Sequence, residues 1–160
     1  MPFRNNVTRL LDAQHIAYEL FELPAEKHSA EETAALLGVQ PEIVFKTLVV
    51  LREAKGKKPM LVMAPGGSEV NLKALAASLG EKKLRLAAQR EAEALTGLQV
   101  GGISALALLN RGFEICLDRS ALGLAAIHLS AGQRGANLKL SVPDLQRLTN
   151  ASIVDTAGSE

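Results

Sequence analysis

Aromatic side chains are almost missing from this sequence: phenylalanine, tryptophan and tyrosine make up 3% of it, and there is no tryptophan. Proteins that bind single-stranded RNA mainly by base stacking need several exposed aromatic rings, so this mode of binding is not expected here. Hydrophobic residues nevertheless form 48% of the chain. The core must therefore be built from aliphatic side chains.

Cysteine and net charge are also scarce. Cys116 is the one cysteine, which excludes an intrachain disulfide and is typical of a protein in a reducing compartment. Eighteen basic and seventeen acidic side chains leave a formal net charge of +1. A chain with this balance has no overall field that would attract a polyanion, so any contact with nucleic acid must be local.

Long apolar segments are absent as well. Residues 1–6 lack the apolar core of a signal peptide, and no apolar stretch approaches the roughly 20 residues of a membrane span. We therefore expect a cytoplasmic protein without a membrane partner. Its length of 160 residues suits one domain with a sizeable core, and we expect residues 1–160 to form a single domain.

Capping residues and hydrophobic spacing predict five helices and about eight short strands. The helices are expected at residues 5–14, from Ser29 to Leu37, from Asn71 to Gly80, at 89–95 and from Ser141 to about Asn150. The strands are expected at residues 17–22, 43–52, 60–64, 84–87, 113–118, 126–130, 137–140 and 153–154. Their uneven order favours an α/β fold with a mixed, partly closed, barrel-like β-sheet and surrounding helices over a regular doubly wound sheet.

The strand at residues 43–52 contains a lysine, Lys46, inside an otherwise apolar run. Alternation places Lys46 on the same face as Val44, Leu48 and Val50. Its ammonium must then lie among aliphatic side chains with an anion nearby, or reach a cleft at the edge of the strand. The other interpretation is an outward lysine whose aliphatic stem covers apolar neighbours.

A second unusual stretch, residues 98–106, is strand-like except for the adjacent glycines Gly101 and Gly102. Paired glycines can present backbone N–H groups to a ligand at close approach, as an ester carbonyl or an oxyanion requires. They can equally form a bulge or a sharp bend in a barrel strand.

Several kinds of chemistry find little support. The three histidines, at 15, 28 and 128, have no zinc-like spacing with each other or with Cys116, so no metal and no cofactor are expected. The fingerprints of phosphate-binding glycine loops are missing. A Cys/His nucleophilic pair is disfavoured, because a thiol inside an apolar strand should have a raised pKa and be inert.

Three stretches together resemble the signatures of one family. They are Val44–Val50 around Lys46, residues 95–104 around the paired glycines, and the turn Ser130–Gly135. In this order they are similar to the YbaK/EbsC family of aminoacyl-tRNA deacylases, which are related to the editing domain inserted in bacterial prolyl-tRNA synthetases. The resemblance covers nearly the whole chain.

This resemblance implies a trans-editing hydrolase that cleaves the ester of mischarged aminoacyl-tRNA, with a small amino acid such as alanine or a Cys-tRNA(Pro)-like substrate. Lys46 would neutralise the terminal nucleotide's phosphate or position the ester, and the Gly101 backbone would hold the carbonyl or the attacking water. In cysteine-specific members the substrate's own thiol is thought to attack the ester. The implied substrate-binding residues are Thr47, Gly102, Ile103, Ser104, Ser130 and Asn137.

The sequence departs from the family pattern at three places. Ala105 replaces a common proline after the glycine loop, and Asn137 stands where many cysteine-specific members have an aspartate that could bind the substrate ammonium. The tyrosine that the family has near the end of its first strand has no clear match here, because Leu20 and Phe21 occupy that region. The partner expected is the 3′ end of an aminoacyl-tRNA, with a synthetase as a further candidate. The alternative function is a binding module of the same fold that recognises a tRNA end or a synthetase without hydrolysis.

Overall fold

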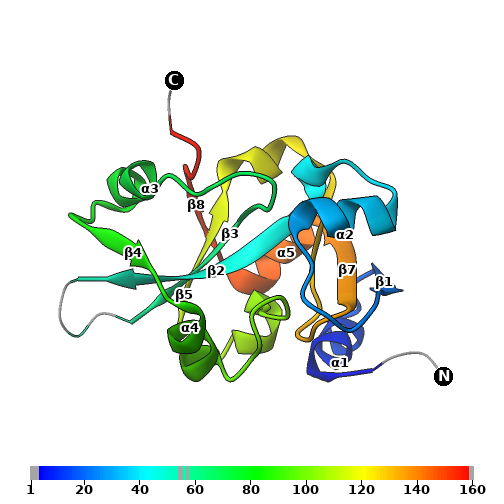
Figure 1. The fold of residues 1–160 in the computed structure, drawn as a ribbon. Helices are drawn as coiled ribbons and strands as arrows, with labels where there is room; N and C mark the ends of the chain where they lie inside the picture. Colours follow the sequence, from blue (N-terminus) through cyan, green and yellow to red (C-terminus); the bar gives the residue numbers. More distant parts are fainter. Residues whose placement is uncertain (1–3, 54–55, 57, 159–160) are drawn as a thin grey trace.

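The computed structural model describes residues 4–53, 56 and 58–158 (Figure 1). The first three residues of the N-terminal stretch interpreted above lie outside the described residues. Within the described part the chain forms five α-helices and eight strands, as predicted. The helices are α1 (Asn6–Ala13), α2 (Ala30–Leu37), α3 (Leu72–Leu79), α4 (Gln89–Thr96) and α5 (Val142–Thr149). The strands are β1 (Tyr18–Glu22), β2 (Phe45–Arg52), β3 (Met60–Pro65), β4 (Leu84–Leu86), β5 (Glu114–Asp118), β6 (Ala126–Ser130), β7 (Ala136–Ser141) and β8 (Ser152–Val154).

Side-chain caps set where the helices begin. The Ser29 hydroxyl accepts a hydrogen bond from Glu32 N at 3.1 Å, and the Glu32 carboxylate accepts one from Ser29 N at 2.9 Å, which completes the predicted capping box. Asn71 caps α3 through Ala74 N at 3.0 Å. Gly80 ends α3 in the left-handed conformation, which glycine adopts without a Cβ clash. These local signals explain why the predicted helices are confirmed.

The strands form two sheets that meet at one edge. The five-stranded sheet has the order β4-β2-β3-β5-β8, antiparallel across β4, β2 and β3 and parallel across β3, β5 and β8. The antiparallel three-stranded sheet has the order β1-β7-β6. A parallel bridge between Val44 and His128 joins the two sheets. The described strands therefore make a mixed, partly closed barrel and not a closed one.

Two apolar clusters cover the two faces of the five-stranded sheet. The larger lies between the sheets and includes Phe45 and Val49 from β2. The smaller packs Val50 from the opposite face of β2 against Leu75 of α3. Figure 1 shows α3 on the side of the sheet away from β1 and β7. A strand with aliphatic neighbours on both faces needs the continuous apolar run that the sequence has here. No helix in the described part of the chain is long and apolar enough to cross a membrane.

The strand-like run at residues 98–106 is not a strand. Gly102 N donates to Gln99 O at 2.8 Å, which closes a turn, and a 3₁₀ helix follows at Ala105–Leu108. Gly101 has φ +96°, a value outside the extended range of a strand. The paired glycines therefore form a loop between α4 and β5, and the interpretation as a bend within a barrel strand is wrong.

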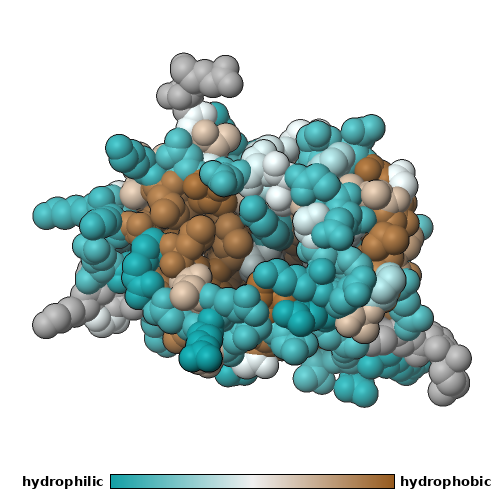
Figure 2. Space-filling model, in the orientation of Figure 1, coloured by the Kyte–Doolittle hydropathy of each residue, from teal (hydrophilic) through white to brown (hydrophobic). Residues whose placement is uncertain are grey.

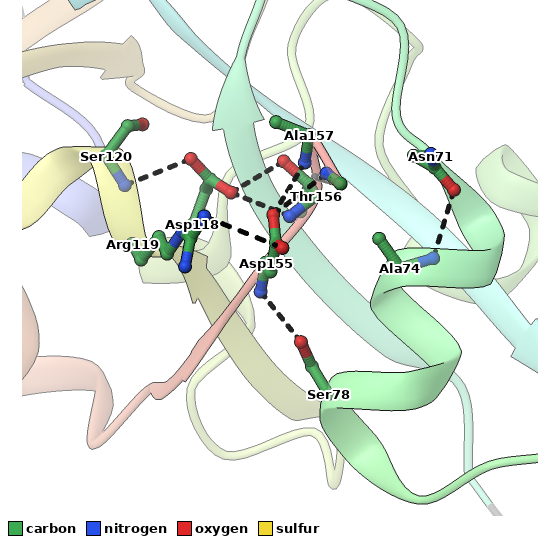
Figure 3. A network of polar contacts seen from close by, with 10 residues as sticks. Asn71, Ala74, Ser78, Asp118, Arg119, Ser120, Asp155, Thr156 and Ala157 are labelled. Atoms are coloured by element: carbon green, nitrogen blue, oxygen red, sulfur yellow. Dashed lines mark hydrogen bonds and ion pairs between the residues drawn. The ribbon is translucent and has the colours of Figure 1, made fainter. Parts of the chain in front are cut away.

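A polar network fixes the C-terminal segment to the end of β5 (Figure 3). The buried carboxylate of Asp118 accepts hydrogen bonds from Thr156 N at 2.8 Å, from the Thr156 hydroxyl at 2.7 Å and from Ser120 N at 3.1 Å. Thr156 O in turn accepts a hydrogen bond from Asn71 N at 2.7 Å. The start of α3, the end of β5 and the C-terminal segment are therefore held together.

We expect Asp118→Asn to lower the free energy of unfolding by about 1–3 kcal/mol, because an amide cannot accept all of these bonds and its NH₂ group is left without an acceptor. Burial opposes the charged form of Asp118, but the hydrogen bonds from Ser120 and Thr156 outweigh it and lower the pKa of the carboxyl. A lowered pKa stabilises the fold above the unfolded value of about 4, and this contribution is lost as the pH falls through the folded value.

Urea denaturation at neutral and acidic pH measures this effect. The control is Glu42→Gln. Glu42 is exposed, and its carboxylate has no hydrogen-bond partner in the described structure. Equal unfolding midpoints for the two variants at neutral pH would contradict the role of Asp118.

Candidate active site

One edge of β2 is left partly open. On one side β3 pairs with Phe45–Val50, but on the other β4 pairs only with Val50–Arg52, extended by the bond from Ala87 N to Val49 O at 2.9 Å. At the near end, β6 pairs with this part of the chain only through the bridge between Val44 and His128. Among the described strands none pairs with residues 45–48 on this side. Since Val49 O points to this edge, alternation turns the N–H and C=O groups of Thr47 toward it as well.

A cavity of about 470 Å³ lies along this open edge. This volume falls in the range of small-ligand sites. Its walls come from β2, from the loop and helix start at residues 23–33, from residues 86–92, from the glycine loop and from the facing ends of β6 and β7. Figure 2 shows an apolar surface framed by α3, β4 and β2, and the cavity includes Leu48 and Leu86 on this side.

Six of the eight predicted site residues line this cavity, and they come from segments far apart in the sequence. They are Lys46, Thr47, Gly101, Ile103, Ser130 and Asn137. Gly102 and Ser104 do not line it. Ser104 is buried and accepts a hydrogen bond from Leu106 N at 3.2 Å, at the start of the 3₁₀ helix.

Lys46 is half-buried, and its Nζ donates to Ser68 O at 2.9 Å. In the described structure it forms no ion pair. Of the alternatives that the sequence left open, the structure has Lys46 at a cavity beside the strand edge, with a backbone carbonyl in the turn after β3 as its partner and no anion among the described residues. A carbonyl satisfies one of the three ammonium donors, so the charge remains available to a bound anion or dipole.

Two side chains hold the glycine loop from opposite sides of Val100. The Glu93 carboxylate accepts a hydrogen bond from Val100 N at 2.8 Å, and Arg134 Nε donates to Val100 O at 2.8 Å. The next backbone N–H, that of Gly101, has no hydrogen-bond acceptor in the described structure. A fixed and unpaired N–H group at a cavity is the type of donor that can hold an ester carbonyl or an oxyanion.

Gly102 has a different role from Gly101. A Cβ at Gly102 would lie 2.7 Å from Arg134 N and 2.7 Å from the Gln133 carbonyl carbon. Backbone this close cannot yield as a flexible side chain would, so residue 102 must be glycine for the loop to pack against the turn at 132–135. A Cβ at Gly101 would meet only side-chain atoms, at 3.4–3.5 Å, but its positive φ favours glycine there.

Ser130 and Asn137 are directly opposite each other on β6 and β7, so their side chains share a face. The Ser130 hydroxyl accepts a hydrogen bond from Gly132 N at 3.2 Å. Asn137 Oδ1 lies 2.9 Å from His128 Nδ1. Because an amide oxygen can only accept, Nδ1 carries the proton, and the NH₂ group of Asn137 is left for the cavity. This wall therefore offers hydrogen-bond donors.

His128 itself is a buried residue and not a surface one. It is 1% exposed, its ring lies 5.4 Å from that of Phe21, and burial lowers the pKa of its imidazole. Among the residues that the structure describes, its Nε2 has no hydrogen-bond partner. A bare imidazole nitrogen costs less to bury than an unpaired N–H, which fits the Nδ1-protonated form. The sequence did not reveal that His128 orients Asn137.

Other reactive groups do not gather at the cavity. Burial raises the pKa of the Cys116 thiol to about 11 although nearby Arg52 opposes this, in the direction expected from its place in an apolar strand. His28 lines the cavity, and its Nε2 lies 2.9 Å from Pro24 O. In the part of the chain that the structure describes, no group of three or more His, Cys, Asp or Glu side chains could hold a metal ion.

The sequence did not indicate two cationic residues at the glycine loop. Lys27 lines the cavity, and its Cγ lies 3.4 Å from the position that a Gly101 Cβ would take. Arg134 Nε lies 3.5 Å from the same position. Arg134 lies in the turn Ser130–Gly135, the third stretch that resembles the family, but the resemblance assigned it no function. Lys27 lies in a loop without a recognisable sequence motif.

The fold and the cavity define an α/β protein with a cavity of ligand-binding size at the open edge of a mixed sheet. Residues 24–148 match the family of the aminoacyl-tRNA editing domain. The "Putative Cys-tRNA(Pro)/Cys-tRNA(Cys) deacylase EbsC" of Enterococcus faecalis is 32% identical over 98% of this chain and 95% of its own length. The "Prolyl-tRNA editing protein ProX" of Acetoanaerobium sticklandii is 26% identical over 95% of this chain and 93% of its own.

A solved structure agrees with these relatives. A "putative trans-editing enzyme for prolyl tRNA synthetase" is similar to this chain with a TM-score of 0.80 and 25% identity, covering 99% of this chain and 100% of the other. The chain thus belongs to the aminoacyl-tRNA editing domain family, in its YbaK/EbsC branch, and the resemblance drawn from the three stretches is confirmed.

We expect Gly102→Ala to lower the free energy of unfolding by roughly 1–3 kcal/mol, because the added methyl group overlaps the backbone of the 132–135 turn. The matched control is Gly123→Ala, where nothing lies within 4 Å of the added Cβ and φ is not positive. This control should stay within about 1 kcal/mol of the unaltered protein. Urea denaturation compares the two, and equal midpoints would show that the close approach at residue 102 is relaxed in solution.

Proposed function

We propose that this protein is a free-standing editing enzyme, folded as a single domain over residues 1–160, that removes a wrongly attached amino acid from tRNA in trans. The observation that supports this most is that Lys46 and Gly101, whose N–H has no acceptor in the described structure, line one cavity at the open edge of β2. That cavity holds donors for an ester and contains a cation without an acidic partner in the described structure.

The reaction is ester hydrolysis. A water molecule attacks the ester carbonyl carbon, the bond from that carbon to the 3′ oxygen of the tRNA breaks, and a proton passes to the leaving oxygen. The Gly101 N–H stabilises the oxyanion that forms in between, and Lys46 lies where its ammonium can neutralise developing charge or position the ester. Thr47, Ile103, Ser130 and Asn137 would shape the pocket around the aminoacyl group.

Gly102 and Ser104 support this pocket without lining it. Gly102 allows the close approach to the 132–135 turn, and Ser104 begins the 3₁₀ helix after the loop. Their contribution to substrate binding would be made through the position of Gly101. Ala105, where the family often has proline, is buried in the main cluster and adds an apolar methyl group there.

The substrate proposed is a tRNA charged with a small amino acid, cysteine or alanine, as the names of the relatives suggest. Asn137 presents an NH₂ group where an aspartate would bind the substrate ammonium, so we expect the ammonium to be bound elsewhere, with the Thr47 carbonyl at the open edge as the candidate acceptor. The partner is the 3′ end of aminoacyl-tRNA, and a prolyl-tRNA synthetase is a further candidate partner. The site of action is the cytoplasm.

We expect Lys46→Ala to lower kcat/KM for a mischarged tRNA by about 10²-fold or more, the size of effect seen when one preorganised electrostatic group is removed. The measurement is single-turnover deacylation of Cys-, Ala-, Ser- and Pro-charged tRNA. The matched control is Lys73→Ala, an exposed lysine on α3 that does not line the cavity.

Equal turnover by the Lys46 variant and the unaltered protein would remove Lys46 from the mechanism. If no charged tRNA is hydrolysed but one is bound stably, the protein is instead a binding module of the same fold. The departures at Ala105 and Asn137 are the features that favour this second function.

A further inference from the structure

We propose that Lys27 and Arg134 form a binding site for the phosphodiester next to the terminal nucleotide of the tRNA, at the mouth of the cavity beside Gly101. This inference rests on the function proposed above and assigns one group of its substrate. Lys27 comes from the loop before α2, and Arg134 comes from the turn between β6 and β7. The fold therefore brings together two cations separated by more than a hundred residues.

The contacts of Gly101 locate this site. A Cβ built on Gly101 would lie 3.4 Å from Lys27 Cγ and 3.5 Å from both Cγ and Nε of Arg134. The stems of both cations therefore lie against the same point. Glycine keeps this point open, and its backbone N–H has no acceptor in the described structure. Two cationic side chains whose stems meet beside a free N–H group can bring their charges to one anion at this open point.

Neither cation is neutralised by the described residues. Lys27 forms no ion pair and no hydrogen bond there, and Arg134 uses only its Nε, on Val100 O. The acids nearby have other arrangements: Glu26 and Glu31 line the cavity without pairing with either cation, and Glu93 accepts from Val100 N. Like charges held together without a counterion repel, so this site favours an anionic ligand.

The chemistry of an aminoacyl-tRNA end decides which group this ligand is. The aminoacyl ester carries a cationic ammonium and no carboxylate, so two cations would repel it. The anions of the substrate are its phosphodiesters, and arginine and lysine are the residues that bind them. With the phosphate held by Lys27 and Arg134, Lys46 is left for the ester, which resolves the two roles that the sequence allowed for it.

The test compares two substrates that differ in this phosphate. One is a full aminoacyl-tRNA, and the other is the same amino acid esterified to adenosine, which has no phosphate. Arg134 also holds the glycine loop, so the substitution is made at the exposed Lys27, as Lys27→Ala with Lys27→Arg as the charge-keeping variant and Lys73→Ala as the control. We expect Lys27→Ala to lower the ratio of kcat/KM for tRNA to that for the nucleoside ester about threefold to tenfold.

A second readout is the dependence on salt. Loss of one phosphate contact to a single strand should reduce the slope of log(kcat/KM) for tRNA against log[salt] by about 0.7, and Lys27→Arg should restore both the ratio and the slope. Lys73→Ala should change neither.

The outcomes separate this site from the function on which it rests. If the unaltered protein hydrolyses both substrates and Lys27→Ala changes neither the ratio nor the slope, the phosphate site is overturned and the editing function stands. If the unaltered protein hydrolyses neither substrate, the proposed function fails and this site falls with it.

Discussion

The site depends on incomplete pairing along one strand. β3 pairs with Phe45–Val50 along one edge of β2, but the other edge is paired only at its far end by β4, and at its near end β6 pairs with the chain only through the Val44–His128 bridge. Unpaired backbone groups buried in protein are costly, so an open edge is kept only where water or a ligand can reach it. The cavity is this gap in the barrel, and Thr47 presents backbone groups to it.

The segments around the open edge of β2 supply the charged side chains and a further hydrogen-bond donor of the site. The loop before α2 brings Lys27, the turn after β6 brings Arg134, and the glycine loop brings an unpaired N–H between them. Each of these three segments is fixed by backbone or side-chain contacts to another: Gly102 packs on the 132–135 turn, and Arg134 Nε bonds Val100 O. The site is therefore held by the same contacts that close the barrel on this side.

Much of the fold could be predicted from the sequence because its signals are local. Ser29 and Asn71 cap their helices, glycines end them, and the apolar run of β2 indicates burial on both faces. At residues 98–106 the alternative of a bend in a barrel strand was wrong: the apolar residues suit a strand, whereas the close approach at Gly102 depends on a turn about 30 residues away. A contact of that kind leaves no trace in local periodicity.

The candidate site, like the fold, could be predicted from the sequence only in part. Lys46, Gly101 and Ser130 could be identified because they lie in stretches that resemble a family, but what surrounds them could not. The Ser68 carbonyl on Lys46 and Lys27 beside Gly101 are long-range contacts, and the His128 imidazole orients Asn137 across the pairing of β6 with β7. Neither His128 nor Lys27 lies in a sequence pattern that indicates such a role.

The most direct test of the central claim, that the open edge of β2 receives the aminoacyl end of a tRNA, is an NMR titration with a non-hydrolysable, amide-linked aminoacyl-adenosine. The account predicts that the largest shifts fall on the backbone amides of Thr47 and Gly101 and on the side-chain NH₂ of Asn137. Shifts confined to α3 and the apolar surface beside it, with those three groups unmoved, would contradict it.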